Sequence, residues 1–388
     1  MDEQTRTIIL AIALLAIVGA IGLLEYQKAP RATPATAQIT PALQSNCTVG
    51  NCGAITQVIS EKAAKYPRAV ELVSPDGYLN LPQGKASISI GELVGKKVVL
   101  VDFWTYSCIN CQRTIPYLNA WYEKYAGKGL EIIGVHTPEF DFEKDHANVA
   151  KAIEKFGIKY PVVQDNQYQT WSAYKNQYWP HKYLIDVDGF IVYDHIGEGG
   201  YEETEKKIQA LLAERMDRLG AKQEISNQTA HPSAEAADGG KLGSPETYFG
   251  SARNRFLTNG QPGVAGVQNL SQPIRTELNE LDLVGSWNFE QEYASNLQAG
   301  AKIVYRYDAK NVYFVAQANN QTQITVLRDG KPVQQEKGAD VQSGAGGSHA
   351  LVKEARLYHL IAEKGYGEHT LEIIVEGAGL KAYTFTFG

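Results

Sequence analysis

Runs of apolar residues alternate with amphipathic segments along residues 66–215, which predicts a sheet covered by helices. Continuous apolar stretches at Val98–Trp104 and Leu130–His136 are typical of strands that are buried on both faces. A helical spacing of apolar residues follows these stretches at 110–124 and again at 142–156. The alternation of strand and helix patterns favours an α/β fold with a central mixed sheet and flanking helices.

The same region ends with a strand pair and a long helix. Tyr183–Asp186 and Phe190–Ile196 predict two strands joined by a short turn at Asp188-Gly189. Tyr201–Leu219 predicts a charged amphipathic helix. We therefore assign residues 66–219 to one domain and the aperiodic residues 220–245 to a linker.

The last part of the chain has a different pattern, in which short alternating runs are separated by turn residues. Such runs predict an all-β, jelly-roll-like sandwich over residues 246–388. The predicted strands are Lys302–Tyr307, Val312–Gln317, Gln323–Leu327, Glu368–Val375 and Ala382–Phe387.

The first residues predict a single membrane helix. Thr7–Leu24 is an uninterrupted apolar run, long enough to cross a bilayer and longer than the usual apolar part of a cleaved signal peptide. We expect residues 1–27 to anchor the protein in the cell membrane, with the C-terminal domains on the extracytoplasmic side. Residues 28–65 then predict an extended tether that carries Cys47 and Cys52.

Composition narrows the possible partners and the compartment. The 388 residues carry a formal net charge of -6, and the chain has no basic stripe, which argues against a nucleic-acid partner. The 4 cysteines form two close pairs, as expected in an oxidising compartment or in a redox protein.

Cys108 and Cys111 form the pair with the clearer chemistry. They follow the strand Val98–Trp104 and a short polar turn, so they are expected at the start of a helix. Peptide dipoles and unpaired N–H groups at a helix N-terminus stabilise a thiolate, which makes Cys108 the expected nucleophile. Cys111, one turn further on, can attack the mixed disulfide that Cys108 forms and so close a Cys108–Cys111 disulfide.

The residues around this pair resemble the thioredoxin family. The matching residues are Asp102-Phe103-Trp104 before the two cysteines and Trp179-Pro180 before the strand at Tyr183. The resemblance implies a cis peptide bond at Pro180, facing the cysteines, and a buried acid at Asp102 that relays the proton of Cys111.

The resemblance can be narrowed by longer matching runs. The segments VDFWTYSCINCQRTIPYLNAW, GVHTPEFDFEKD, WPHKYLIDVDG, SPETYFG, RLYHLI and AYTFTFG resemble the DipZ group of cytochrome c biogenesis proteins and TlpA-like thiol–disulfide oxidoreductases. This resemblance places Glu139 near the site as a second candidate acid. It also implies a substrate groove formed by Trp104, Trp179, Ile109 and Asn110.

The expected function follows from this site. We expect a thiol–disulfide oxidoreductase that reduces protein disulfides and needs no cofactor or metal. DipZ-type proteins begin with a multi-span electron-carrying domain, whereas this chain has one possible span. A separate membrane electron-transfer protein is therefore the expected source of electrons.

Several alternatives remain open. The four cysteines can form a zinc site, and Thr105-x-x-Cys108 resembles the motif of a thiol peroxidase. The C-terminal sandwich can serve as a glycan- or protein-binding module. Cys47 and Cys52 can form a structural disulfide or a second redox pair that relays electrons to Cys108.

Overall fold

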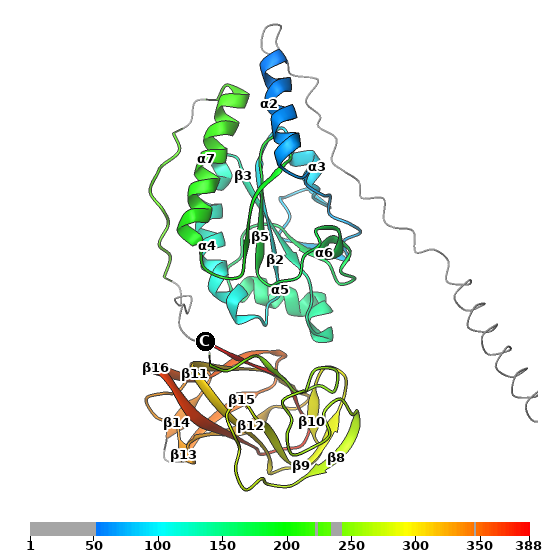
Figure 1. Ribbon diagram of the computed structural model, residues 1–388, viewed down its shortest axis with the longest axis vertical. Helices are drawn as coiled ribbons and strands as arrows, with labels where there is room; N and C mark the ends of the chain where they lie inside the picture. Colours follow the sequence, from blue (N-terminus) through cyan, green and yellow to red (C-terminus); the bar gives the residue numbers. More distant parts are fainter. Residues whose placement is uncertain (1–51, 222–223, 234–242, 345–346) are drawn as a thin grey trace, which may run out of the picture.

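The chain forms an α/β part and a β-rich part that lie end to end (Figure 1). The computed structural model describes residues 52–221, 224–233, 243–344 and 347–388. The predicted anchor at Thr7–Leu24 and the Cys47 end of the predicted Cys47–Cys52 disulfide lie outside these ranges. Among the helices that are described, none is long and apolar enough to cross a membrane.

A six-stranded mixed sheet forms the centre of the α/β part. β2 lies inside this sheet, parallel to β3 on one side and antiparallel to β5 on the other. All seven residues of β2 are buried, as its continuous apolar sequence predicts. In spatial order the strands are β1 (Gly77–Leu79), β4 (Val162–Gln164), β3 (Leu130–His136), β2 (Val98–Trp104), β5 (His181–Ile185) and β6 (Ile191–Ile196).

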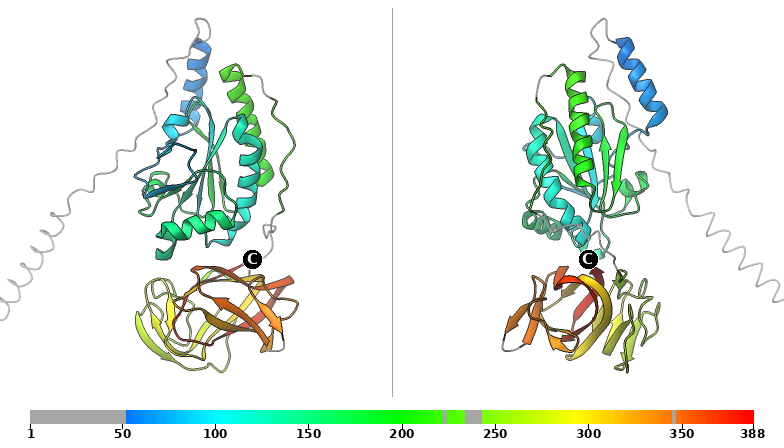
Figure 2. Two further views of the ribbon diagram at one scale, coloured as in Figure 1. Left: turned by 180° about the vertical axis from the view of Figure 1, so that it is seen from behind. Right: turned by 60° about the vertical axis from the view of Figure 1, so that its left-hand side comes forward.

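Helices cover both faces of the sheet (Figure 2). Because successive strand residues point to opposite faces, β2 contributes to two cores. Val98 and Leu100 pack in one core with residues of α4 (Ile109–Tyr125) and α7 (Tyr201–Leu219). Alternate residues of the strand enter a second core on the other face. The remaining helices are α2 (Cys52–Lys65), α3 (Ile90–Leu93), α5 (His146–Lys155), α6 (Gln169–Ala173) and the 3-10 helices η1 (Ala126–Lys128) and η2 (Asp141–Lys144).

The β-rich part is built on one curved sheet of eleven strands. Two long antiparallel strands, β11 (Ala301–Ala318) and β16 (Arg356–Val375), form its spine. The others are β7 (Thr247–Tyr248), β8 (Gly266–Leu270), β9 (Leu281–Phe289), β10 (Ala294–Asn296), β12 (Thr322–Arg328), β13 (Lys331–Pro332), β14 (Gln342–Gly344), β15 (Gly347–Val352) and β17 (Leu380–Phe387). The two strands predicted at 302–307 and 312–317 are thus halves of β11.

Most aromatic residues of the β-rich part lie in its core. Trp287, Phe289, Tyr305 and Tyr307 belong to this core, and Tyr313 is buried in the apolar cluster against the α/β part; all five are at most 1% exposed. Rings buried to this extent cannot stack on a sugar. Their alternation along the strands therefore reflects packing.

Two segments, one predicted to be part of a tether and one part of a linker, are held against the α/β part. Residues 52–65 were predicted to belong to the tether, and this prediction is wrong: they form helix α2. Lys62 of this helix pairs with buried carboxylates of the α/β part. Residues 224–233 have no helix or strand, yet they pack on α4 and α7. Gln228 accepts a hydrogen bond from Lys124, and Ala230 N–H donates to Glu205 over 2.7 Å. These contacts join residues distant in sequence, so local periodicity does not reveal them.

Candidate active site

Cys108 and Cys111 lie at the junction of β2 and α4, as the sequence predicts. Cys108 is the N-cap residue of α4, and its carbonyl oxygen accepts a hydrogen bond from Gln112 N–H over 3.0 Å. Its side chain is partly exposed, whereas Cys111 is 1% exposed and packs in the core beneath. Both are free thiols in the structure, so it shows the dithiol form, and the Cys108–Cys111 disulfide stays a prediction for the oxidised form.

The segment before β5 faces the partly exposed thiol. The Trp179–Pro180 peptide bond is cis, which confirms the predicted geometry. Cys108 Sγ lies 4.0 Å from the carbonyl oxygen of Trp179. The Trp179 ring is held by a hydrogen bond from its Nε1 to Thr137 O and by packing on Trp171. Backbone of this segment is thus placed beside the sulfur that a substrate would meet.

Asp102 is buried in the strand that leads to the cysteines. It is 1% exposed, and its Oδ1 has no hydrogen-bond partner. Burial raises the pKa of Asp102 to about 7, against the opposing effect of Lys182 on the neighbouring strand. Burial also raises the pKa of the Cys111 thiol, and the charge of Asp102 adds to this. A carboxyl group that titrates near neutrality therefore lies close to the buried thiol.

Glu139, the second candidate acid, lies apart from Asp102 in the loop after β3. Its carboxylate accepts hydrogen bonds from Tyr248 Oη and from Arg253 Nη1, each over 2.8 Å. Both partners belong to the β-rich part. Glu139 therefore joins the two parts of the molecule at the edge of the site.

Glu143 is a residue near the site that the sequence analysis missed. Its buried carboxylate accepts hydrogen bonds from Ser107 Oγ over 2.6 Å and from the Glu139 and Phe140 N–H groups over 2.6 and 3.0 Å. It thereby ties the turn before Cys108 to the loop after β3. Glu143 lies among other charged residues in the segment EFDFEKD, so the sequence does not indicate that its side chain is buried.

The β-rich part packs against the residues between the two cysteines. Ile109 is 4% exposed and belongs to an apolar cluster with Phe140 of the α/β part and with Val315 and Tyr383 of the β-rich part. Nearby, Arg113 Nη2 donates a hydrogen bond to Tyr313 Oη over 3.1 Å. The position predicted to face a substrate groove is therefore partly covered by the chain itself.

A cavity of about 280 Å³ remains between the two parts beside Cys108. Of the predicted groove residues, Ile109, Asn110 and Trp179 line it. Trp104 does not: it is fully buried in the core and packs edge-on against His136, so the prediction that it walls the groove is wrong. The β-rich part contributes Glu246, Tyr248, Arg253, Val315, Thr384 and Thr386 to the lining.

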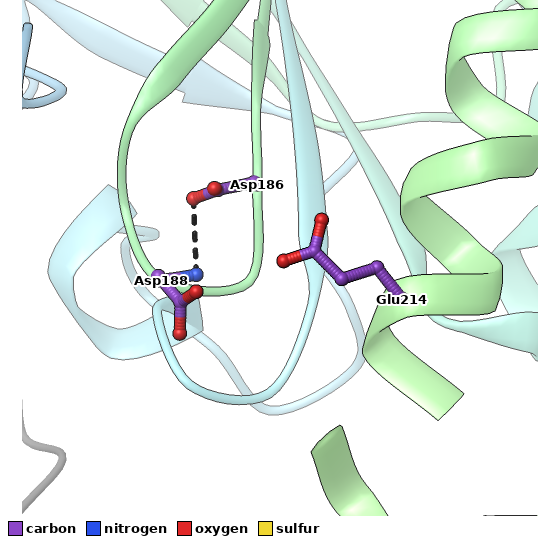
Figure 3. Close-up of side chains that lie close together, drawn as sticks. All are labelled: Asp186, Asp188 and Glu214. Carbon is purple, nitrogen blue, oxygen red and sulfur yellow. Dashed lines mark hydrogen bonds between the residues drawn. The ribbon is translucent and has the colours of Figure 1, made fainter. Parts of the chain in front are cut away.

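One group of carboxylates in the described residues has the spacing of a metal site. Asp186 and Asp188 follow β5, and Glu214 extends from α7 toward them (Figure 3). The Lys62 ammonium lies among all three, 2.6 Å from Asp186 and 2.8 Å from Asp188, and Arg218 also pairs with Asp188. A metal ion would have to displace Lys62, so this group serves to fix α2 to the sheet.

Comparison with known proteins finds a family match in each of the two parts of the chain. Residues 74–194 match the AhpC/TSA family, and residues 244–388 match the thioredoxin-like C-terminal domain. Thiol-disulfide oxidoreductase ResA of Bacillus thuringiensis is 36% identical over 33% of this chain and 70% of its own length. Thiol-disulfide oxidoreductase YkuV of Bacillus subtilis is 27% identical over 37% of this chain and 93% of its own length.

The fold and the paired thiols are those of the thioredoxin-like class of proteins. The chain belongs to the family of thiol–disulfide oxidoreductases. It is also 38% identical, over 82% of its length, to Protein DipZ of Mycobacterium bovis, which confirms the resemblance inferred from the sequence. The chain spans 43% of the length of that relative.

The raised pKa of Asp102 predicts a pH-dependent stability. The carboxyl group is ionised above about pH 4 when unfolded but resists ionisation below about pH 7 when folded. Its contribution is therefore complete below about pH 4 and is lost as the pH rises to about 7. Relative to Asp102→Asn, the wild type should lose up to about 4 kcal/mol of unfolding free energy over this interval. Urea titrations of both proteins measure this difference, and parallel pH profiles would contradict it.

Proposed function

We propose that the protein is a membrane-anchored, extracytoplasmic enzyme that reduces protein disulfides with Cys108 and Cys111. The observation that carries the proposal is the unequal burial of the two thiols on one turn of α4. The accessible Cys108 can meet a client, and Cys111 is sheltered until Cys108 has reacted. The cis Pro180 segment beside Cys108 supports the same role.

The reaction proceeds by two exchanges. The Cys108 thiolate attacks one sulfur of the client disulfide, the S–S bond breaks, and the other sulfur leaves with the electron pair and takes up a proton. Cys111 then loses its proton and attacks Cys108 Sγ, which releases the second client sulfur as a thiolate and leaves a Cys108–Cys111 disulfide. The client gains two electrons and the enzyme is oxidised.

Asp102 is the proposed acceptor of the Cys111 proton. The thiol is buried, so ionisation needs a nearby base. A carboxyl group with a pKa of about 7 exchanges protons readily at neutral pH. Lys182, buried on the adjacent strand, favours the charged form of both groups.

The sequence supports the proposed location of the enzyme. The apolar run at Thr7–Leu24 supports a membrane anchor, with residues 66–219 and 246–388 as two extracytoplasmic domains. The resemblance of the sequence to cytochrome c biogenesis proteins favours a link to that process, and we propose that a membrane electron-transfer protein supplies the electrons. The jelly-roll-like domain at 246–388 would then shape how clients approach Cys108, as its contacts with Ile109 suggest.

Trapping tests the order of attack. In Cys111→Ser the mixed disulfide formed at Cys108 should persist, because no second thiol can resolve it. Incubation with a disulfide-bonded test protein, followed by non-reducing electrophoresis and mass spectrometry, should give a stable adduct at Cys108. Cys108→Ser is the matched control and should give none. Adducts in the control, or none in Cys111→Ser, would show that Cys108 is not the attacking residue.

The reduction potential of the Cys108–Cys111 pair tests whether the enzyme reduces or oxidises its clients. A reductase should have a potential near the thioredoxin value of about -270 mV, and an oxidase one nearer -120 mV. Equilibration of the protein with glutathione buffers, followed by alkylation and mass measurement, gives this value. A potential close to that of the oxidases would mean that the enzyme forms client disulfides instead of reducing them, by the same thiol–disulfide exchange at Cys108 and Cys111.

A further inference from the structure

Two carboxylates share one hydroxyl group in the cavity beside Cys108. Tyr248 Oη lies 2.8 Å from Glu139 Oε1 and 2.7 Å from Glu246 Oε2. Both are hydrogen-bond distances, yet a phenol has a single proton to donate. With both carboxylates ionised, the two would have to share that proton, whereas protonation of one carboxyl group gives each contact a proton of its own.

The neighbouring charge decides which carboxyl group is protonated. Arg253 Nη1 lies 2.8 Å from Glu139 Oε1, so Glu139 is the ionised member that accepts from both Arg253 and Tyr248. Glu246 is therefore the member of the pair that can take up a proton. When protonated it donates to Tyr248 Oη, which donates to Glu139; when ionised it accepts from Tyr248. Arg253 donates to Glu139 in both states.

The surroundings of Glu246 favour its neutral form. Its side chain is exposed and lines the cavity between the two parts of the molecule. Desolvation by the protein atoms around the cavity and the charge of Glu139 raise the pKa of Glu246 to about 7, against hydrogen bonds from Tyr248 and Thr386 and the charge of Arg253. The other titratable groups that line the cavity are Cys108 and Tyr178.

We propose that Glu246 is the general acid that protonates the sulfur leaving the client disulfide when Cys108 attacks. This inference rests on the proposed function, because it assigns a proton donor to its first step. The Cys108–client S–S bond forms, the client S–S bond breaks, and the departing sulfur keeps the electron pair. The Glu246 proton passes to that sulfur, giving a neutral thiol and a Glu246 carboxylate.

The β-rich part then supplies a catalytic group as well as a wall of the site. Glu246 and Cys108 line one cavity of about 280 Å³, so a disulfide seated there can meet both. Protonation matters most for aliphatic thiols, which are poor leaving groups, and least for aromatic thiols, which leave readily as thiolates. The role of Glu246 should therefore depend on the leaving group.

The test compares two disulfides in the Cys111→Ser background, where only the first step occurs. Stopped-flow and quenched mass spectrometry give the rate of Cys108 adduct formation with hydroxyethyl disulfide, whose leaving thiol is aliphatic, and with an aromatic nitrobenzoate disulfide. Glu246→Gln should slow the aliphatic reaction about tenfold or more and change the aromatic reaction less than twofold. Glu372→Gln, the same substitution in the β-rich part at an ion pair with Lys302 that does not line the cavity, is the control.

The pH dependence gives a second readout. The ratio of the aliphatic to the aromatic rate cancels the ionisation of Cys108, which is common to both reactions. In the protein with Glu246 this ratio should fall as the pH rises through about 7, because the acid loses its proton. In Glu246→Gln the ratio should not change with pH.

Each outcome decides the inference. If Glu246→Gln lowers the rate of adduct formation equally with both disulfides, Glu246 only supports the structure of the site. If it lowers neither rate, Glu246 has no role in this step. Both results overturn the inference while the proposed function stands. Failure of Cys108 to form adducts in the protein that retains Glu246 would overturn the proposed function itself.

Discussion

The site depends on one constraint: two sulfurs one helical turn apart occupy different environments. β2 is buried along its whole length and delivers the chain to the start of α4 at the edge of the core. Cys108, as the N-cap residue, meets the surface, and Cys111, on the inner side of the first turn, enters the core. The partly exposed Cys108 sulfur can attack a client disulfide, whereas the buried Cys111 sulfur can react only with the mixed disulfide at Cys108. The order of the two exchanges therefore follows from packing.

The β-rich part adds a second constraint by covering much of the surface around Cys108. Ile109 packs into an apolar cluster with Val315 and Tyr383, while polar contacts to Glu139 close one side. What remains open is a small cavity that residues from both parts line. Access to the sulfur is therefore a property of the interface, and charged groups from the β-rich part lie within reach of the chemistry.

Much of this arrangement could be predicted from the sequence, because local patterns determine it. β2, β3 and α7 have the predicted bounds, and the positions of Cys108 and Pro180 followed from the strands beside them. Long-range contacts determine the rest. Nothing near Glu143 marks it as a buried acceptor, and Trp104 lies in the core because of the direction in which β2 presents it. The helix at Cys52–Lys65 is held by Lys62 on carboxylates more than a hundred residues away.

The difference in access between the two thiols is tested most directly by alkylation of the native, fully reduced protein. Iodoacetamide is added in a time course, and peptide mass spectrometry measures the modified fraction of each cysteine. Cys108 should be modified at least tenfold faster than Cys111, because only the ionised and accessible sulfur reacts. Modification of Cys111 at an equal or greater rate would contradict the account, since the buried thiol could then no longer be the one that resolves the mixed disulfide.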